Sequence, residues 1–299
     1  MTERLFRTEG GELRAPWRLA LFGAVVFASA TVVLGIGFSV GAATPLAAWA
    51  RAARFPVEQW LTVLSLVLAT WLTARLLKGE EYSVWRYVGL GRGSWSPRVL
   101  AVASSAGVLV IAVPVLALIV TGGARFEPSV ATDSPVMVAW TAFALLAPAA
   151  VAEELLFRGY AFSACVDAVG EKAAIAGTSV FFALAHLANP DPTVLSMTAI
   201  AMAGVFLAVV RVATGSLVAA GVAHFWVNYT QAVVLHAPVS GLALQMPGYR
   251  FVESGPDWLT GGPWGPEASV GAVAALALAS FLYFRRFRGT QTSTPAATS

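Results

Sequence analysis

The sequence predicts an all-α protein, a polytopic transmembrane helix bundle of about eight spans with both termini in the cytoplasm. Hydrophobic residues make up 58% of the chain and charged residues only 12%, whereas about a quarter of the residues in soluble proteins are charged. Almost uncharged runs of about 20 residues, the length that crosses a bilayer, recur along the whole sequence. We therefore expect residues 1–299 to form a single integral-membrane domain.

Each expected span is a run of high hydropathy between more polar residues. The first run is about 25 residues long, which is too long for the core of a signal peptide, so we expect it to remain as a span. The fifth and sixth runs are separated by LANPDPT, in which the Asn-Pro and Asp-Pro steps break helices. The expected spans are 19–43, 59–77, 99–121, 136–166, 172–189, 193–211, 215–236 and 267–284.

The distribution of basic residues gives the expected orientation. With the N-terminus in the cytoplasm, all but four of the 19 Lys and Arg residues lie on or towards the cytoplasmic side. This agrees with the excess of Lys and Arg in the cytoplasmic loops of membrane proteins. The four exceptions are Arg51, Arg54, Arg125 and Arg250.

Two segments between and after the spans are polar or rich in turn-forming residues. The connection 237–266 is rich in Gly and Pro and contains Trp258 and Trp264, which is typical of an external loop at the membrane interface. Its function is left open. The tail 289–299, GTQTSTPAATS, consists of small, uncharged residues, and we expect it to be disordered.

Composition also narrows the possible partners. The formal net charge is only +3, and basic clusters interleaved with aromatics are missing, so we expect no nucleic-acid partner. The lipid bilayer is the expected environment. The single cysteine, Cys165, excludes an internal disulfide framework. The Ala-rich, Lys-poor composition suggests a bacterial protein, with a multi-pass location in the inner (plasma) membrane.

The segment VAEELLFRGY places Glu153, Glu154 and Arg158 within the fourth apolar run. Burying an ionisable group in a bilayer costs at least about 2.5 kcal/mol, so such groups usually face a bundle interior or a water-filled cavity. Glu154 and Arg158 are four residues apart and should pair on one helix face. Glu153 is rotated by about 100 degrees from Glu154 and must have another partner.

Two of the three histidines lie at a similar depth in other expected spans. His186 ends FFALAH in the fifth span, and His224 begins HFWVN in the seventh. Asn228 is four residues after His224, so both project from the same face. Three helices thus carry polar groups of the catalytic type, which favours a common interior site over three lipid-facing positions.

These three segments resemble the motifs of a known family. EELLFR matches EExxxR, FALAH with Phe182 and His186 matches FxxxH, and HFWVN matches HxxxN, in the order found in CPBP (ABI) intramembrane proteases. That family includes the type II CAAX prenyl endopeptidases and bacterial bacteriocin-processing and self-immunity proteins. The resemblance covers about residues 136–236, which we expect to form the catalytic core, and it implies an intramembrane endopeptidase acting on a peptide or protein.

Peptide hydrolysis needs an activated water, a proton shuttle and stabilisation of an oxyanion. Our hypothesis makes Glu153 the general base, with His186 helping to hold and polarise the same water. Glu154, held by Arg158, would orient the site. His224 and Asn228 would donate hydrogen bonds to the oxyanion, as is thought for similar enzymes of the family. Phe182 is expected to pack the site.

A metal mechanism is the alternative, because Glu153, His186 and His224 could hold zinc with an open position for water. Against this, the adjacent glutamates point to different faces of a helix, and there is no HExxH segment. We favour a glutamate and histidine mechanism without metal, and the cofactor stays open between none and zinc.

Two other classes of function compete with the protease. One is a non-enzymatic membrane scaffold or bacteriocin immunity protein with the same fold, which would tolerate the replacement of Glu153 by Gln. The other is a transporter, because intramembrane carboxylates and histidines also build proton relays. The sequence has neither an internal repeat nor a pair of interrupted helices in matching halves, which argues against a transporter.

Overall fold

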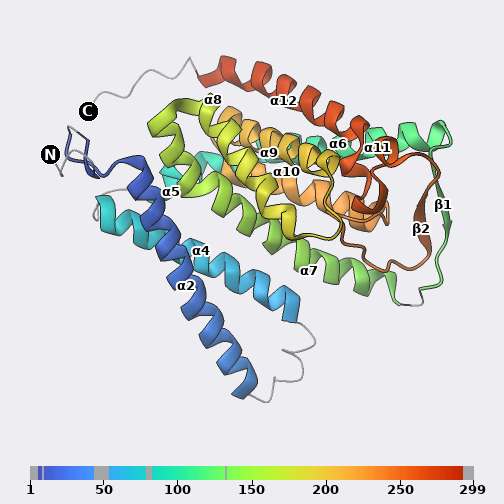
Figure 1. Ribbon diagram of the computed structural model, residues 1–299, viewed down its shortest axis with the longest axis horizontal. Helices are drawn as coiled ribbons and strands as arrows, with labels where there is room; N and C mark the ends of the chain where they lie inside the picture. The colour runs from blue at the N-terminus through green and yellow to red at the C-terminus, as the bar shows by residue number, and fades with distance from the viewer. Residues whose placement is uncertain (1–5, 9, 44–53, 79–82, 132, 292–299) are drawn as a thin grey trace. The chain divides into compact units, whose positions relative to one another are not determined.

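The protein is mostly helical, as the sequence predicts. The structure is a computed structural model and describes residues 6–8, 10–43, 54–78, 83–131 and 133–291 (Figure 1). Most of the described residues belong to helices, and six helical segments are long and apolar. Arg51 and residues 292–299 of the expected tail lie outside the described residues.

Six helical segments in the described part of the chain are long and apolar enough to cross a membrane. This supports a multi-pass membrane protein. The helices that form them are α2 (Ala15–Ala43), α4 (Arg54–Lys78), α6 (Pro97–Val120), the continuous segment from α7 to Ala188, α9 (Val194–Thr214) and α12 (Val270–Gln291).

The expected number of eight spans is not confirmed. The fourth and fifth expected spans lie in one helical segment, Pro135–Ala188. The seventh corresponds to α10 (Leu217–Tyr229) and the π-helix η4 (Thr230–Val234) that continues it, and this segment is not among the six. The expected cytoplasmic location of both termini remains a prediction.

The segment Pro135–Ala188 consists of α7 (Pro135–Glu154), the π-helix η2 (Leu155–Gly159), α8 (Tyr160–Ala185) and the 3₁₀ turn η3 (His186–Ala188). A straight helix of 54 residues would be about 80 Å long, far more than the ~30 Å core of a bilayer. Gly170 interrupts α8 with φ 80° and ψ 166°. This break lies between the fourth and fifth spans that hydropathy predicts.

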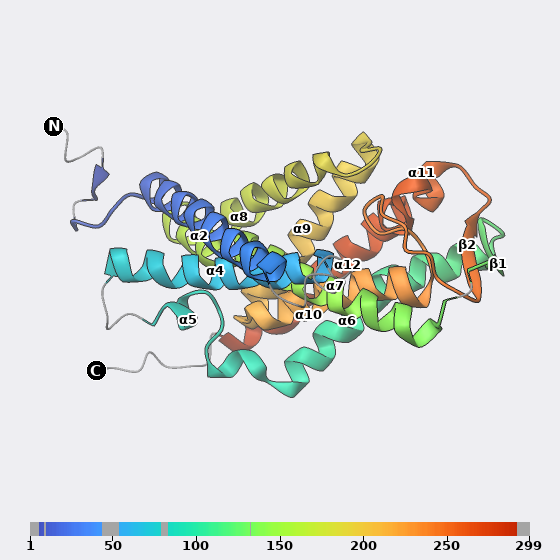
Figure 2. The same cartoon turned by 90° about the horizontal axis from the view of Figure 1, so that it is seen from below.

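The chain divides into two compact units, and the segment from α7 to α8 contributes to both. Unit 1 consists of the residues up to Gly91 together with Ala144–Ala174. In it α2 packs along α4, as Figure 2 shows, and the short helix α5 (Val84–Tyr87) packs with them. The buried core of this unit is formed by Phe22, Ala69, Ala74, Val84, Val88, Tyr160 and Ala164.

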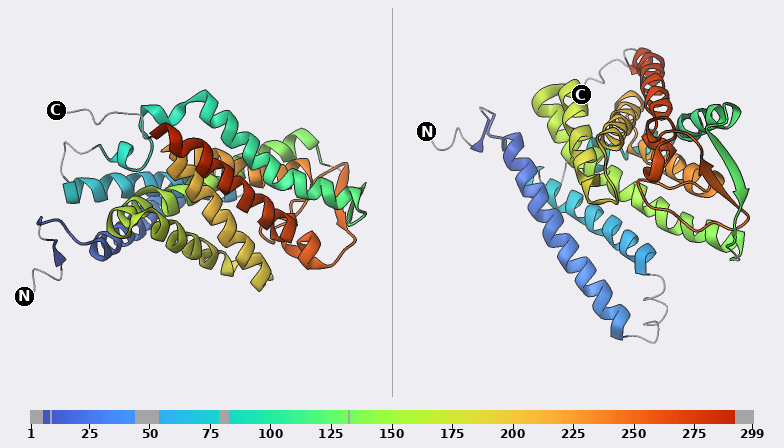
Figure 3. Two further views of the ribbon diagram at one scale, coloured as in Figure 1. Left: turned by 90° about the horizontal axis from the view of Figure 1, so that it is seen from above. Right: turned by 45° about the vertical axis from the view of Figure 1, so that its right-hand side comes forward.

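Unit 2 consists of Arg92–Phe143 and the residues from Ile175 onwards. Its helices α6, α9, α10 and α12 pack against one another, and Figure 3 shows α12 lying along α9. Gly107 allows α6 to approach α10 closely, because a Cβ there would meet the carbonyl oxygen of Ala223. The buried core of this unit includes Ile111, Val115, Phe206, Val210 and Leu276.

The expectation of a purely α-helical protein is wrong in one detail. Strands β1 (Ala124–Pro128) and β2 (Tyr249–Glu253) form a two-stranded antiparallel sheet in unit 2 (Figure 1). The two strands are more than a hundred residues apart in the sequence, so short-range hydropathy does not reveal their pairing. The sheet anchors one part of the connection 237–266, whose remainder includes α11 (Asp257–Thr260) and the 3₁₀ turns η5 (Gly262–Trp264) and η6 (Pro266–Ala268).

Candidate active site

The two adjacent glutamates are the last residues of α7 in unit 1. Glu154 is only 1% exposed and Arg158 is fully buried, and Nη1 of Arg158 donates to Oε1 of Glu154 across 3.0 Å. This is the ion pair that the four-residue spacing predicts. Glu153 is less buried than its neighbour. The two carboxylates therefore occupy different environments, as expected for neighbouring residues of a helix.

The helix changes its geometry immediately after the glutamates. Residues Leu155–Gly159 form the π-helix η2, which contains Arg158. A π turn holds one extra residue in the helical ladder, and such turns are frequent at functional sites. Hydropathy predicts one span over 136–166 and does not reveal the π turn, since no residue in LLFRG distinguishes a π turn from an α turn.

His186 lies in unit 2, at the point where α8 becomes the 3₁₀ turn η3. Its Nδ1 is 2.8 Å from the backbone carbonyl oxygen of Phe182. Because a carbonyl oxygen only accepts hydrogen bonds, Nδ1 donates, and in the neutral ring Nε2 is then the nitrogen with a lone pair. This tautomer suits a histidine that accepts a hydrogen bond from water or binds a metal.

Phe182 contacts both histidine rings. Its ring centroid is 4.7 Å from that of His186 and 5.9 Å from that of His224, where the two rings meet nearly at right angles. Phe182 is 2% exposed and His224 is 6% exposed. The packing of this one aromatic side chain therefore links the orientations of the two imidazoles.

Asn228 follows His224 by one helical turn in α10 and is half-buried. The π-helix η4 (Thr230–Val234) begins two residues later. All three motifs thus lie at or next to a departure from regular α-helical geometry. The structure brings Phe182, His186 and His224 together in unit 2, and Glu154 and Arg158 together in unit 1.

One buried carboxylate of unit 2 was not predicted from the sequence. Glu267, in η6, is 6% exposed, and its Oε1 accepts hydrogen bonds from the backbone N–H of Ser240 at 2.6 Å and from its hydroxyl at 2.8 Å. Burial raises the pKa of Glu267 above the usual range, whereas the hydrogen bonds from Ser240 and the charges of His186 and His224 lower it. The only signal in the sequence is a lone acidic residue at the start of the last apolar run.

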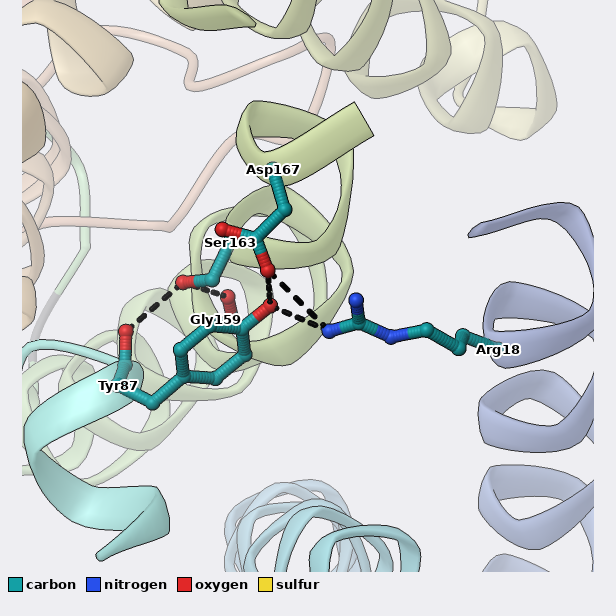
Figure 4. Close-up of polar contacts among 5 residues, drawn as sticks. All are labelled: Arg18, Tyr87, Gly159, Ser163 and Asp167. Carbon is teal, nitrogen blue, oxygen red and sulfur yellow. Dashed lines mark hydrogen bonds and ion pairs between the residues drawn. The ribbon is translucent and has the colours of Figure 1, made fainter. Parts of the chain in front are cut away.

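A second polar network in unit 1 joins α2, α5 and α8. Arg18 donates from Nη2 to the hydroxyl of Tyr87 at 2.6 Å, and the Tyr87 hydroxyl donates to Oδ2 of Asp167 at 2.6 Å (Figure 4). Arg18 also pairs with Asp167 at 3.3 Å, and the Ser163 hydroxyl donates to the backbone carbonyl of Tyr87. Burial and the hydrogen bond to Asp167 raise the pKa of Tyr87. This network holds the helix that continues from the glutamates.

The three candidate metal ligands divide between the units, with Glu153 in unit 1 and His186 and His224 in unit 2. Within the part of unit 2 that the structure describes, the His, Cys, Asp and Glu side chains do not gather in a group of three or more that could hold a metal ion. The histidine pair supplies two of the three protein ligands of a catalytic zinc site.

Comparison with known proteins identifies the segment that carries the motifs. The fold and the polar motifs define a mostly helical, multi-pass membrane protein with ionisable groups inside its apolar segments. Residues 135–230 match the family described as Type II CAAX prenyl endopeptidase Rce1-like, and they form a domain of that CPBP family. No curated protein and no solved structure matches the chain. The matched segment includes all the predicted site residues, whereas Glu267 lies beyond it.

Proposed function

We propose that the protein is an intramembrane endopeptidase that hydrolyses a peptide bond with a water activated by glutamate and histidine. The observation that carries this proposal is the position of the polar groups. The Rce1-like segment contains a fully buried Glu–Arg pair next to a second glutamate, and two histidines that share one buried aromatic ring. Groups of this kind are costly in an apolar protein, and at membrane depth they usually serve a function.

Glu153 is the proposed general base. Glu153 is less buried than Glu154, whose carboxylate pairs with Arg158, and it is therefore proposed as the carboxylate of the two that faces water. A carboxylate within hydrogen-bond reach of a water molecule can accept its proton as the water attacks the peptide carbonyl. His186 is proposed to accept a second hydrogen bond from the same water through Nε2, because its Nδ1 donates to the carbonyl of Phe182.

His224 and Asn228 are proposed to donate hydrogen bonds to the oxyanion of the tetrahedral intermediate. They are one turn apart on α10, so both can reach one oxygen atom. Preorganised donors of this kind, in a site with little water, stabilise developing negative charge strongly. Glu154 and Arg158 are proposed to fix the end of α7 and thereby the direction of Glu153.

The proposed substrate is a peptide or a protein segment that reaches the site within the membrane. The name of the matched family refers to prenylated CAAX sequences, and the proposal for this chain is limited to the shared reaction, peptide-bond hydrolysis. The inner (plasma) membrane of a bacterium is the proposed location. A zinc ion held by Glu153, His186 and His224 would supply an activated water in place of the general base, so sensitivity to a chelator separates the two mechanisms.

The test is cleavage of a peptide library by the purified protein in detergent. Wild type is compared with Glu153→Gln and His186→Ala, and wild type is assayed again after treatment with a strong chelator. The proposal expects cleavage by wild type and loss of cleavage in both variants. Cleavage that persists in both variants would contradict it. Activity that survives the chelator supports the mechanism without metal, and activity that is lost and restored by zinc supports the metal mechanism.

A non-enzymatic scaffold is the second candidate, and one observation favours it. The buried Glu154–Arg158 pair is the kind of contact that also serves as an architectural clamp between or within helices. The scaffold predicts that a cellular phenotype of the protein survives Glu153→Gln, whereas the protease predicts that the phenotype is lost.

A further inference from the structure

The connection after α10 is attached to the ends of both histidine-bearing helices. Gln231, in the π-helix that follows α10, donates from Nε2 to the backbone carbonyl of Pro238. Asn189, three residues after His186, donates from Nδ2 to the backbone carbonyl of Ser240 at 3.0 Å. Residues 237–268, which we call the cap, therefore contact the segments that follow His186 and His224.

Ser240 has a backbone conformation that needs support. Its φ is 49°, in the left-handed region that residues other than glycine rarely adopt. Such a conformation persists only where surrounding contacts hold it. Glu267 provides two of these contacts, because one carboxylate oxygen accepts both the N–H and the hydroxyl of Ser240. The Ser240 carbonyl is at the same time the acceptor for Asn189.

Two glycines of the cap pack closely against Pro190 and Gln231, which lie outside it. Gly241 has φ 81°, donates its N–H to the carbonyl of Trp264, and would bring a Cβ to 2.8 Å from the carbonyl oxygen of Pro190. Gly265 has φ 106° and would bring a Cβ to 2.9 Å from Nε2 of Gln231. The turn η6 packs against α9 and leaves Glu267 buried. The carboxylate is thus fixed by the fold, and it interacts electrostatically with both His186 and His224.

We propose that Glu267 is a positioning residue of the active site: through Ser240 it fixes the cap on the segments that follow the two histidines. The proposal rests on the proposed protease function for its catalytic consequence. Glu267 lies outside the matched segment 135–230 and outside the three motifs. The proposal also gives the connection 237–266 a role, because the cap of which it is part holds the ends of the two histidine-bearing helices in place.

The first test measures docking of the cap without any assay of activity. Hydrogen exchange of the purified full-length protein is followed in peptides that cover 186–193 and 237–242. Glu267→Ala should raise exchange in both peptides by about tenfold or more, because Ser240 loses both of its hydrogen bonds to the carboxylate and its carbonyl is then no longer held at Asn189. Glu267→Gln, which keeps the volume and an acceptor oxygen, should show a smaller increase and guards against a variant that fails to fold.

Glu253→Gln is the matched control. Glu253 is a partly buried carboxylate in the same connection, and its hydrogen-bond partner is Thr260, which lies within the cap. This variant should leave exchange in both peptides as in wild type. Unchanged exchange in Glu267→Ala, or an equal increase in Glu253→Gln, would overturn the proposal whether or not the protein is a protease.

The second test measures peptide cleavage by the same variants. Glu267→Ala should lower kcat by about tenfold or more with KM nearly unchanged, because the histidines lose their alignment, and Glu267→Gln should restore part of the rate. A normal kcat, or a rise in KM alone, would overturn the positioning role. A wild-type protein without any peptidase activity would instead contradict the proposed function, and the exchange experiment would still decide whether Glu267 docks the cap.

Discussion

Arg158 donates to Glu154 across 3.0 Å, and neither side chain is accessible to solvent. A buried ion pair contributes less stability than its short distance suggests, because both charges lose their hydration. Removal of one partner destabilises the protein by more than the intact pair stabilises it, since the remaining charge stays buried. The pair therefore makes the end of α7 intolerant of single substitutions.

Replacement of Arg158 by Met should lower the free energy of unfolding by about 3–5 kcal/mol, because Glu154 loses its cation in a buried position. Unfolding in mixed detergent micelles measures the change. The double variant Glu154→Gln, Arg158→Met should recover most of the loss, since it contains neither charge. A double variant as unstable as the single one would show that the ion pair is not the cause.

Loss of the Tyr87 hydroxyl should weaken the attachment of α2 and α5 to α8. Tyr87→Phe removes the hydrogen bond to Asp167 and the one from Arg18. We expect the free energy of unfolding to fall by about 1.5 kcal/mol, which is at the low end for hydrogen bonds to charged groups. The low value is expected because the Asp167 side chain is 48% exposed. A double-mutant cycle with Arg18→Met measures the coupling. Additive losses in the two single variants would contradict a shared network.

The motifs and the expected spans could be predicted because both depend on neighbouring residues. The four-residue spacing of Glu154 and Arg158, and of His224 and Asn228, already defines a shared helix face. Hydropathy likewise found the interruption near Gly170, where small and polar residues separate two apolar runs. The ion pair and the helical character of the chain followed from such local patterns.

Other features depend on contacts that are distant in the sequence. The pairing of Phe126 with Phe251 in the sheet and the hydrogen bonds from Ser240 to Glu267 join segments that no periodicity connects. The π turn at Leu155–Gly159 depends on how the surrounding helices pack. The number of eight spans is not confirmed, because the fourth and fifth expected spans share one helical segment that is interrupted at Gly170, and because α10 passes into the π-helix η4 after 13 residues.

Truncation of Phe182 should affect both histidines. Phe182→Ala leaves a cavity next to His186 and His224, and we expect it to lower the free energy of unfolding by about 3–5 kcal/mol. Phe182→Leu fills most of the space and should cost clearly less. Under the proposed function, the peptidase rate should fall in the same order. Equal stability of the Ala and Leu variants would contradict a close-packed ring.

The break in α8 should depend on glycine at position 170. Its φ of 80° and ψ of 166° lie in a region that is almost restricted to glycine, so Gly170→Ala should destabilise the protein by about 1–3 kcal/mol. Gly177 provides the control within the same helix, because a Cβ there has nothing within 4 Å and its φ is not positive. Gly177→Ala should be neutral or stabilise by up to about 1 kcal/mol. The opposite order of stabilities would contradict a break at Gly170.

The most direct measurement compares kcat for wild type and Glu153→Gln on one peptide that the wild type cleaves, with both proteins folded to the same extent in detergent. A positioned general base contributes about 10²–10⁴-fold to the rate, so kcat should fall by at least about a hundredfold, while the Glu154–Arg158 pair keeps the variant folded. A Glu153→Gln protein that cleaves within a few fold of the wild-type rate would contradict the assignment of Glu153 as the base.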